Sequence, residues 1–569
     1  MSTQTHLLRT RRFLPLFLTQ FLGAFNDNTF KNALVVLLTF QAAHWTTLAP
    51  GLLANLAAGL FILPFFLFSA TAGQLADKYD KARLARLVKL LEMAIMVIAW
   101  IGFVRESLAW LLVALALLGV HSTLFGPVKY ALLPQHLKPD ELLGGNALVE
   151  AGTFVAILLG TLAGGLLAGS GHPEVIALAG LVVAGFGYLA SRSIPAAPAP
   201  APGLRVEANL LASTWRTLDQ AREVRSVFLS ILGISWFWLF GALFLAQFPA
   251  YAKEVLGGGT SVVTLLLATF TIGVGAGSMA CERLSGTRVE LGLVPFGSLG
   301  LSLFALDLAL ASPAAVPSGA PLGLAVLLGD FQTWRILIDL ALVGLFGGFF
   351  IVPLYALVQL RSPAERRARI IAANNIMNAL FMVVGALAAA GVLAAGWRIP
   401  SLFLAAALVN ALVGLYIYTL VPEFLIRFLV WLAMHSIGRV RPFGFAALPA
   451  EGPALLVLAP ARPLGLADLL LVLAASPRPV RCVVEPGARG FYRWILQETG
   501  AIQAGPDSAT AIADALAAGQ VVLAPAGMVL PEAPGYRLAL RATRRKRAGL
   551  LPPPSVVVLA PVRPIQATA

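Results

Sequence analysis

Charged and amide side chains interrupt the middle of the first long apolar segment of the chain. The segment from Phe13 to Phe40 is apolar at both ends, and its centre reads FNDNTFKN over residues 25–32. An aspartate at membrane depth costs about 2.5–3.5 kcal/mol, so such a residue normally faces a cavity, a ligand or a counter-charge. Asp27, Asn28 and Lys31 are therefore candidate substrate-binding residues. Asp27 and Lys31 are four residues apart, so a local structural ion pair is the alternative.

Two later apolar segments carry further polar residues. Asn146, Glu150 and Thr153 are spaced i, i+4 and i+7, which places them on one face of a helix. Glu150 lies about two turns inside that segment, where it too needs water or a counter-charge. Lys129 and Tyr130 end the preceding apolar segment. We expect Lys129, Tyr130, Asn146 and Glu150 to bind substrate together with the first cluster.

The second half of the chain offers neutral groups where the first half offers charges. Tyr355, Asn374 and Asn378 can donate and accept hydrogen bonds, and Trp238 lies within the aromatic run WFWLF at residues 236–240. An exposed tryptophan ring can hold a quaternary ammonium by cation–π attraction, although most rings of such a run face lipid. We expect the N-terminal half to bind the charges of a zwitterionic, amphiphilic substrate.

A short polar loop follows the second apolar segment and reads GQLADKYDKAR over residues 73–83. Its aspartate can cap a helix start and pair with a basic residue of a neighbouring helix in one conformational state. A loop that is merely solvated is the alternative. The predicted role is gating, by Gly73, Asp77, Lys78, Lys81 and Arg83.

The whole chain is far more apolar than a soluble protein. Its 569 residues are 59% hydrophobic and only 12% charged, against roughly 25% charged residues in an average globular protein. Apolar runs of about 20 residues, the length that spans a bilayer, recur over the first 420 positions. We predict an all-α polytopic membrane protein with twelve transmembrane helices, centred near residues 26, 61, 95, 119, 156, 183, 239, 271, 301, 346, 383 and 409.

Lysine and arginine concentrate in alternate loops, which predicts the orientation in the membrane. The N-terminus and the even-numbered loops carry most of them, and only Arg105, Lys253 and Arg398 lie near the opposite face. Because cytoplasmic loops carry the excess of basic residues, we expect both termini in the cytoplasm. The net charge of +14 is then explained by topology and anionic lipid, so no nucleic-acid partner is expected. The two cysteines make neither a disulfide framework nor a metal site, and we expect no metal or cofactor.

The apolar part of the chain divides into two similar halves. A Pro/Ala-rich stretch at 194–203 separates six apolar segments from six, and PVKYA at 127–131 recurs as PLYA at 353–356. Two six-helix repeats with a binding site at the midplane are a known carrier arrangement; a chance match of short words is the alternative. The predicted parts are an N-terminal half at 1–195, a cytoplasmic linker at 196–222 and a C-terminal half at 223–422.

The composition changes after Pro422. Residues 423–441 carry Arg427, Trp431 and His435 at four-residue spacing, which predicts an amphipathic helix lying in the membrane interface. Residues 442–569 predict a small α/β domain. Its expected strands are Ala454–Leu458, Val480–Val484, Val521–Leu523 and Ser555–Ala560, and its expected helix is Ser508–Ala518.

Two resemblances cover residues 10–420. The loop at 73–83 resembles the signature of the major facilitator superfamily, with Asp80 where the family usually has Gly. FLGAFNDN (21–28), GPVKYALLP (126–134) and the stretch 145–168 look like those of bacterial lysophospholipid transporters. The resemblance implies a major facilitator fold, a headgroup site that includes Asp27, Lys129 and Glu150, and lysophospholipid transport to the cytoplasmic leaflet of the bacterial inner membrane for re-acylation. We also expect a monomer among membrane lipids. A carrier of another small solute is the rival, because fold alone does not fix cargo.

The tail resembles the glycerol-phosphate acyltransferases, which use a His and an Asp separated by four residues and later a Phe-Pro-Glu-Gly motif. Here Asp468 is retained, but Pro463 stands where the His belongs and Ala526 where the Glu belongs. The sequence holds no histidine after His435, and a general base is worth about 10²–10⁴ in rate. We therefore expect a degenerate domain and no enzyme activity. The alternatives are a membrane-anchored or bifunctional lysophospholipid acyltransferase, and a tail that docks a separate acyltransferase or acyl-ligase.

Overall fold

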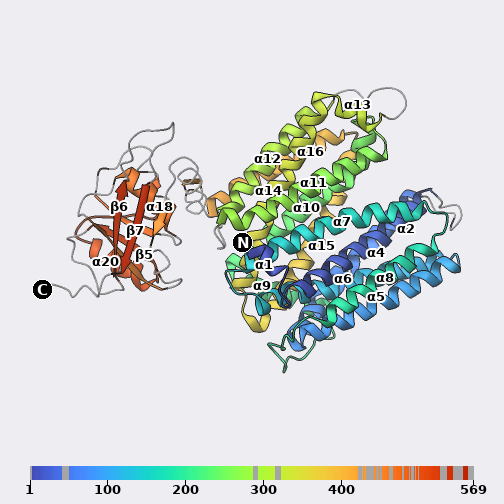
Figure 1. Cartoon of the computed structure of the whole chain (residues 1–569), viewed down its shortest axis with the longest axis horizontal. Coiled ribbons are helices and arrows are strands. Elements are labelled where there is room, and N and C mark those ends of the chain that lie inside the picture. The colour runs from blue at the N-terminus through green and yellow to red at the C-terminus, as the bar shows by residue number, and fades with distance from the viewer. Residues whose placement is uncertain are drawn as a thin grey trace. The chain divides into compact units, whose positions relative to one another are not determined.

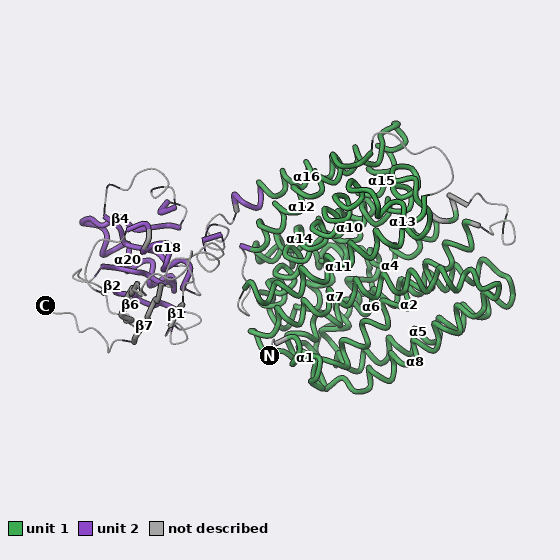
Figure 2. The backbone as a smooth tube through the Cα atoms, turned by 45° about the horizontal axis from the view of Figure 1, so that its top comes forward, with its two compact units in different colours: residues 1–289, 293–415 green, residues 290–292, 416–569 purple. Residues whose placement is uncertain are grey.

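The computed structural model of the chain contains two compact units (Figure 2). One unit comprises residues 1–289 and 293–415, and the other comprises residues 290–292 and 416–569. The structure describes residues 3–40, 46, 50–285, 292–313, 322–420, 426, 429–430, 441–443, 448, 452–459, 465–476, 480–485, 487, 493, 495–497, 499–525, 535–542 and 555–561.

The first unit is helical (Figure 1). After the short α1 (Thr3–Leu7), its first six long helices are α2 (Leu14–Phe40), α4 (Pro50–Lys78), α5 (Lys81–Val104), α6 (Leu108–His136), α7 (Leu142–Ala168) and α8 (Glu174–Arg192). The second six are α10 (Arg225–Glu254), α11 (Thr260–Ser285), α12 (Leu293–Ala311), α14 (Phe331–Arg361), α15 (Arg367–Ala394) and α16 (Ile399–Leu420). Short helices α9 (Leu210–Arg222), α13 (Leu324–Leu328) and η1 (Ala364–Arg366) lie between them.

Within the described residues, eleven of these helices are long and apolar enough to cross a membrane. The twelfth long helix, α2, has 27 residues and carries the polar cluster of residues 25–32 at its centre. The predicted fold of two six-helix sets is confirmed. The repeated words also fall on matching elements, because PVKYA lies in α6 and PLYA in α14, the fourth long helix of each set.

Glycines allow the closest helix contacts of the bundle. A Cβ atom on Gly160 or Gly164 of α7 would overlap backbone oxygens of α2, and one on Gly277 of α11 would overlap a backbone oxygen of α14. Small residues at four-residue spacing permit such approach of two backbones. These contacts bring α7 against α2 and α11 against α14, which places the polar residues of α2 and α7 near one another.

The predicted linker at 196–222 contains structure of its own. The backbone N–H of Ala197 donates to the Asp80 carboxylate over 2.8 Å, and the N–H of Lys81 donates to the Ala197 carbonyl over 3.0 Å. Asn209 then caps α9, whose thirteen residues fill the end of the linker range. The Pro/Ala-rich stretch is thus attached to the turn between α4 and α5.

The second unit contains a seven-stranded sheet with the order β1-β7-β6-β2-β5-β3-β4. All described neighbours are parallel except β6 and β7. The strands are β1 (Arg441–Phe443), β2 (Ala454–Ala459), β3 (Val480–Val484), β4 (Ile502–Gln503), β5 (Val521–Pro525), β6 (Gly535–Ala542) and β7 (Ser555–Pro561). The expected small domain with short strands is therefore present, and β1, β4 and β6 are strands that the sequence pattern did not predict.

The two faces of this sheet are covered separately. Leu456 of β2 packs in one apolar cluster with Leu469 of α18 (Leu466–Ala475), whereas the adjacent Leu455 packs in another with Ile512 of α20 (Ser508–Ala517). Successive side chains of a strand point to opposite faces, so both layers are built from one run of leucines. Most of the predicted interfacial helix at 423–441, as well as Pro463 and Ala526, lies outside the described residues.

Candidate substrate cavity

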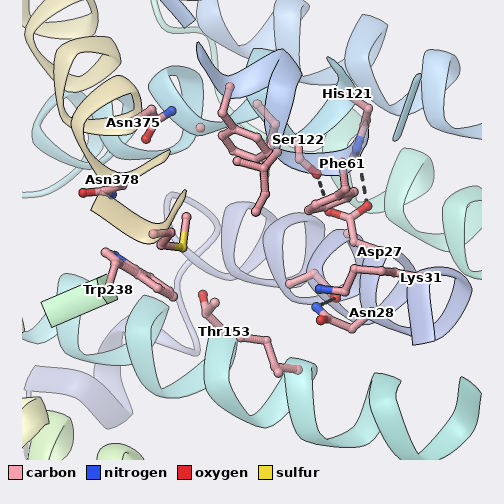
Figure 3. Close-up of a pocket in the computed structure, with 18 of the residues that line it drawn as sticks. Asp27, Asn28, Lys31, Phe61, His121, Ser122, Thr153, Trp238, Asn375 and Asn378 are labelled. Atoms are coloured by element: carbon pink, nitrogen blue, oxygen red, sulfur yellow. Dashed lines mark hydrogen bonds and ion pairs between the residues drawn. The ribbon is translucent and has the colours of Figure 1, made fainter. Parts of the chain in front are cut away.

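A cavity of about 710 Å³ lies within the helical unit and is lined by residues of both six-helix sets. Ligand sites in proteins commonly occupy 300–1,000 Å³. Figure 3 shows a close-up of the cavity with polar and aromatic lining residues as sticks. The lining residues are Gln20, Gly23, Ala24, Asp27, Asn28, Lys31, Asn32, Val35, Ala58, Phe61, Ile62, Phe65, His121, Ser122, Phe125, Gly126, Lys129, Tyr130, Thr153, Ile157, Trp238, Ala246, Tyr355, Asn375, Asn378 and Met382.

The first polar cluster of the sequence faces this cavity. Asp27, Asn28 and Lys31 project from α2 (Figure 3), and Asp27 is the central residue of that 27-residue helix. At 1.5 Å per residue it lies about 20 Å from either helix end, near the middle of a bilayer. The cavity therefore carries a carboxylate at mid-depth, where the sequence predicted it.

Asp27 and Lys31 have different neighbours. The Ser122 hydroxyl of α6 donates to the Asp27 carboxylate, and the Nδ1 atom of His121 lies 3.7 Å from Asp27 Oδ1. The Lys31 Nζ atom instead lies 5.1 Å from the centroid of the Phe61 ring of α4. The two charges share one wall of the cavity, but the described contacts of Asp27 run to α6. The local ion pair considered as the alternative is not among them.

Aromatic rings close the cavity where the two helix sets meet. Tyr130 of α6 and Tyr355 of α14 stack with centroids 4.4 Å apart and ring planes 8° from parallel. The indole N–H of Trp238 donates to the Tyr355 hydroxyl over 3.1 Å, and Lys129 Nζ lies 4.6 Å from the Tyr130 ring centroid. These four residues, all predicted to bind substrate, form the floor of the cavity.

Glu150 lies behind the floor and does not line the cavity. It is fully buried, and its Oε1 accepts a 2.5 Å hydrogen bond from the Tyr130 hydroxyl. Glu150 therefore affects the cavity only indirectly, by fixing the position of the Tyr130 side chain. Asn378 does line the cavity and accepts a hydrogen bond of 2.8 Å from Ser235. Asn374 is buried outside the lining, and its neighbour Asn375 takes the cavity position.

Asn146 is also placed outside the cavity. Its side-chain amide exchanges two hydrogen bonds with Gln359 of α14, one of 2.7 Å and one of 3.0 Å. Both side chains are buried. A reciprocal amide pair of this kind joins the two helix sets, so Asn146 contributes to closure between them and not to the lining in this conformation.

The loop predicted to gate lies at a contact between the two sets. Asp77, fully buried at the end of α4, accepts hydrogen bonds from the backbone N–H groups of Ala368 and Arg369 over 3.1 and 3.3 Å. It also accepts one of 3.0 Å from the Arg369 guanidinium. Because α15 begins at Arg367, Asp77 caps the first turn of a helix from the other set.

The remaining loop residues surround this cap. A Cβ atom on Gly73 would lie 2.7 Å from Ala372 Cβ and 2.8 Å from Arg369 Cα, so only glycine fits against α15 here. Lys81 is buried, whereas Arg83 is exposed; Lys78 Nζ lies 5.6 Å from the Tyr79 ring. We call this end of the bundle, where α4 and α14 end and α5 and α15 begin, the basic end.

The cavity extends away from the basic end. The helix α2 starts at the basic end, and its lining residues continue past Lys31 to Val35. The helix α4 ends at the basic end with Lys78, and its lining residue Ala58 lies far from that end. The basic end is closed by the Asp77 cap and by the Asn146–Gln359 pair. This geometry is that of a carrier closed at one end, with its central site on the other side of the closure.

The model of the Major Facilitator Superfamily matches residues 16–329. The chain belongs to the major facilitator superfamily. It is a multi-pass membrane transporter, as its fold and apolar helices also indicate. The fucose:proton symporter FucP of E. coli shares the fold with a TM-score of 0.53 at 14% identity, over 72% of this chain and 99% of that one. The human organic anion transporter MFSD10 also shares the fold, with a TM-score of 0.51 at 16% identity, over 72% of this chain and 97% of that one.

Curated relatives of this superfamily member carry a more specific name. The lysophospholipid transporter LplT of Klebsiella pneumoniae subsp. pneumoniae is 29% identical over 63% of this chain and 84% of its own length. LplT of Serratia proteamaculans is 27% identical over 62% of this chain and 81% of its own length. LplT of Escherichia coli O157:H7 is 28% identical over 66% of this chain and 86% of its own length. The predicted resemblance to bacterial lysophospholipid transporters is thereby confirmed.

Sequence reasoning missed a buried charged cluster beside the cavity of this major facilitator protein. Lys89 and Glu92 of α5 are fully buried and in contact over 2.5 Å, and His121 of α6 joins Glu92 to Asp27. The signal was present, because Lys89 and Glu92 are i,i+3 charges inside a predicted span and His121 lies at the centre of the next one. The criterion that identified Asp27, an ionisable residue at membrane depth, applies equally to these three.

Proposed function

We propose that this protein is a lysophospholipid transporter that moves lysophospholipids such as lysophosphatidylethanolamine between the leaflets of a bacterial inner membrane. The observation that carries the proposal is the division of the cavity lining. Charges of both signs line the cavity, from Asp27 and Lys31 at mid-depth and from Lys129 in the floor, and apolar residues continue from mid-depth toward one end of the bundle. An amphiphile with a charged headgroup matches both parts.

The headgroup contacts follow from charge. The phosphate of a lysophospholipid pairs with Lys31 or Lys129, and its ammonium pairs with Asp27, while Trp238 offers its ring from the floor. The acyl chain then lies along Val35, Ile62, Phe65 and neighbouring apolar side chains. Every charged group of the lining belongs to the N-terminal set, which supports the expectation that this set binds the substrate charges.

The orientation and direction belong to the same proposal. The basic end carries Lys78, Lys81, Arg83 and the arginines at 366–369, so the positive-inside rule puts it, together with both termini, in the cytoplasm. The conformation described here is then closed to the cytoplasm. Rocking of the two helix sets would break the Asp77 cap and present the headgroup site to the cytoplasmic leaflet.

We further propose that the C-terminal domain has no acyltransferase activity. The sequence holds no histidine after His435, which removes the usual general base. The retained acid, Asp468, caps α18 by accepting a 3.2 Å hydrogen bond from the Gly465 backbone N–H. Acyl transfer by the purified chain, lost on removal of residues 442–569, would instead support the bifunctional enzyme. A domain that docks a separate acyltransferase is tested by co-purification with and without those residues.

The experiment that tests the transport proposal is a flipping assay. The full chain is reconstituted in liposomes with fluorescent lysophosphatidylethanolamine, and inward movement is followed by the loss of signal available to an external quencher. We expect transport by the wild type and a loss of at least about tenfold in Asp27→Asn, because each 1.4 kcal/mol of lost headgroup binding is a factor of ten. Asp219→Asn, an exposed acid on α9, is the matched control and should transport normally.

The outcomes separate the rival functions. No flipping by a folded wild type rejects the lipid substrate and leaves a carrier of another small solute, to be sought by thermal-shift screening of soluble anions and zwitterions. Flipping that is equal in Asp27→Asn and wild type retains the substrate but rejects the proposed headgroup site.

A further inference from the structure

A fully buried charged cluster connects the cavity to the interior of the N-terminal helix set. The Lys89 ammonium donates to Glu92 Oε2 over 2.5 Å, and the Asn26 side-chain amide donates to Glu92 Oε1 over 2.7 Å. The His121 Nε2 atom lies 3.2 Å from Glu92 Oε2. Lys89, Glu92, His121 and Asn26 are each at most 1% exposed, so the cavity reaches this cluster only at His121.

His121 is enclosed by carboxylates on both sides of its ring. Nε2 faces Glu92 of α5, and Nδ1 faces Asp27 of α2 at 3.7 Å, with the dashed contacts of Figure 3 marking the Asp27 side. A neutral imidazole carries one N–H and one lone pair, whereas an imidazolium carries two N–H donors. Two carboxylates on the two nitrogens therefore favour the imidazolium, and the proton on Nδ1 is the one nearest the cavity.

The charges of the cluster balance only when His121 is protonated. Lys89 and an imidazolium supply two positive charges, against the two negative charges of Glu92 and Asp27. The helix α4 meets this part of α6 with Phe61 and Pro64, which do not titrate. The acid of α7, Glu150, is held by Tyr130, and Lys31 and Lys129 lie on the cavity wall. Because Lys89, Glu92 and His121 are buried, a net charge on the cluster is expensive, so a change at Asp27 must be answered at His121.

We propose that His121 is a proton-binding site linked to substrate, and that a cationic headgroup bound at Asp27 displaces one proton from His121. This inference rests on the proposed function, because it takes the substrate ammonium to pair with Asp27. When the ammonium occupies the Asp27 carboxylate, the imidazolium loses one of its two counter-charges. Nδ1 then releases its proton to water in the cavity, His121 remains neutral, and the Lys89–Glu92 pair is unchanged.

The cluster is better suited to a proton than to a metal cation. The Lys89 ammonium already occupies Glu92 at 2.5 Å, and a second fixed positive charge in the same buried space opposes a metal ion. Linkage is reciprocal, so a proton that leaves on binding means that substrate binds more tightly as the pH rises. Headgroup binding at this site is thus an exchange of one proton for one ammonium group.

Isothermal titration calorimetry tests this with the full chain in nanodiscs and lysophosphatidylethanolamine below its micelle concentration. Titrations in two buffers of different ionisation enthalpy give the number of protons released. We expect about one proton per bound lipid, and a Kd that falls as the pH rises, by up to about tenfold per pH unit. Lysophosphatidylglycerol, which has no cationic group, should bind without releasing a proton.

Variants assign the proton. In His121→Gln we expect binding that releases no proton and a Kd that is independent of pH. Glu92→Gln, which leaves the cavity lining intact, is the second variant and should lower the number of protons released. His172→Gln, an exposed histidine in the loop between α7 and α8, is the control and should behave as the wild type.

Three outcomes would overturn the proton proposal, and a fourth would count against the proposed function. Wild-type binding of lysophosphatidylethanolamine with no proton release overturns the proposal and leaves lipid transport standing. The same follows from His121→Gln with undiminished release, or from equal release with lysophosphatidylglycerol. No binding heat from either lipid, in protein that is monodisperse, counts against the proposed function itself.

Discussion

Replacing Asp77 by asparagine should open the basic end. In the closed conformation the carboxylate accepts three hydrogen bonds from α15, two from backbone N–H groups and one from the Arg369 guanidinium. Hydrogen bonds to charged groups are worth about 1.5–3 kcal/mol each. The asparagine oxygen keeps one of the three, and water replaces some of the rest once the end opens. A net loss of about 2 kcal/mol is therefore expected, which shifts the closed-to-open ratio by about 30-fold.

Spin-label distances measure this shift. Asp140 in the α6–α7 loop and Ala364 in η1 are exposed, belong to different helix sets and lie at the basic end. Labels on Asp140→Cys and Ala364→Cys should give one short distance in the wild-type background. With Asp77→Asn, a longer distance should become a major population.

Asp80→Asn is the matched control for this prediction. Asp80 lies three residues away, but its carboxylate accepts from Arg83 N and Ala197 N and makes no described contact with α15. The reasoning is refuted if Asp77→Asn leaves the distance distribution unchanged, or if Asp80→Asn lengthens it equally.

Three further predictions concern packing, thiol reactivity and pH. Gly73→Ala should slow transport by hindering closure of the basic end, since its Cβ overlaps the α15 backbone; a normal rate with normal label distances contradicts this. Cys281 and Cys482 are buried, and burial raises the pKa of the Cys482 thiol to about 12, so maleimide should label the native chain near pH 7 only after denaturation. The hydrogen bonds from Arg12 lower the pKa of Glu141, so this pair stabilises the fold above the ordinary glutamate pKa and its effect is lost as the pH falls below it. Arg12→Gln should therefore lower the Tm by the equivalent of about 1 kcal/mol or less near pH 7 and hardly at all near pH 3, and an equal loss at both pH values would refute the pairing.

The sequence predicted most of the helical unit because membrane solvent imposes a simple rule. Apolar length alone places a spanning helix, and the predicted centres near residues 183, 239 and 346 fall within α8, α10 and α14. The same solvent makes an isolated charge conspicuous, which is why Asp27 and Lys31 were identified and do face the cavity. In the second unit, short strands such as β4 at 502–503 have too few residues to show a period.

Spacing along one helix could not show which partner each polar residue chooses. Asn146 and Glu150 share a helix face, yet Asn146 pairs with Gln359 and Glu150 with Tyr130. These partners come from the other set or from a neighbouring helix, and an i, i+4 pattern carries no information on them. The depth of His121 in a predicted span marks it as a candidate, but its two acidic partners come from other helices and could not be predicted from spacing.

The repeated word of the two halves explains how the cavity floor is built and why it must move. Tyr130 and Tyr355 occupy matching places in PVKYA and PLYA, so folding of two similar halves brings the two rings together at 4.4 Å. The halves differ in what supports each ring, since Tyr130 is held by the buried Glu150 and Tyr355 by the Trp238 N–H. The stack lies between Asp27 and Lys31 at mid-depth and the closed basic end, so a substrate that passes to that end must separate it. The floor and the Asp77 cap are therefore two successive barriers across the same interface, and opening requires both to break while Asp27, Lys31 and Lys129 stay together on one helix set.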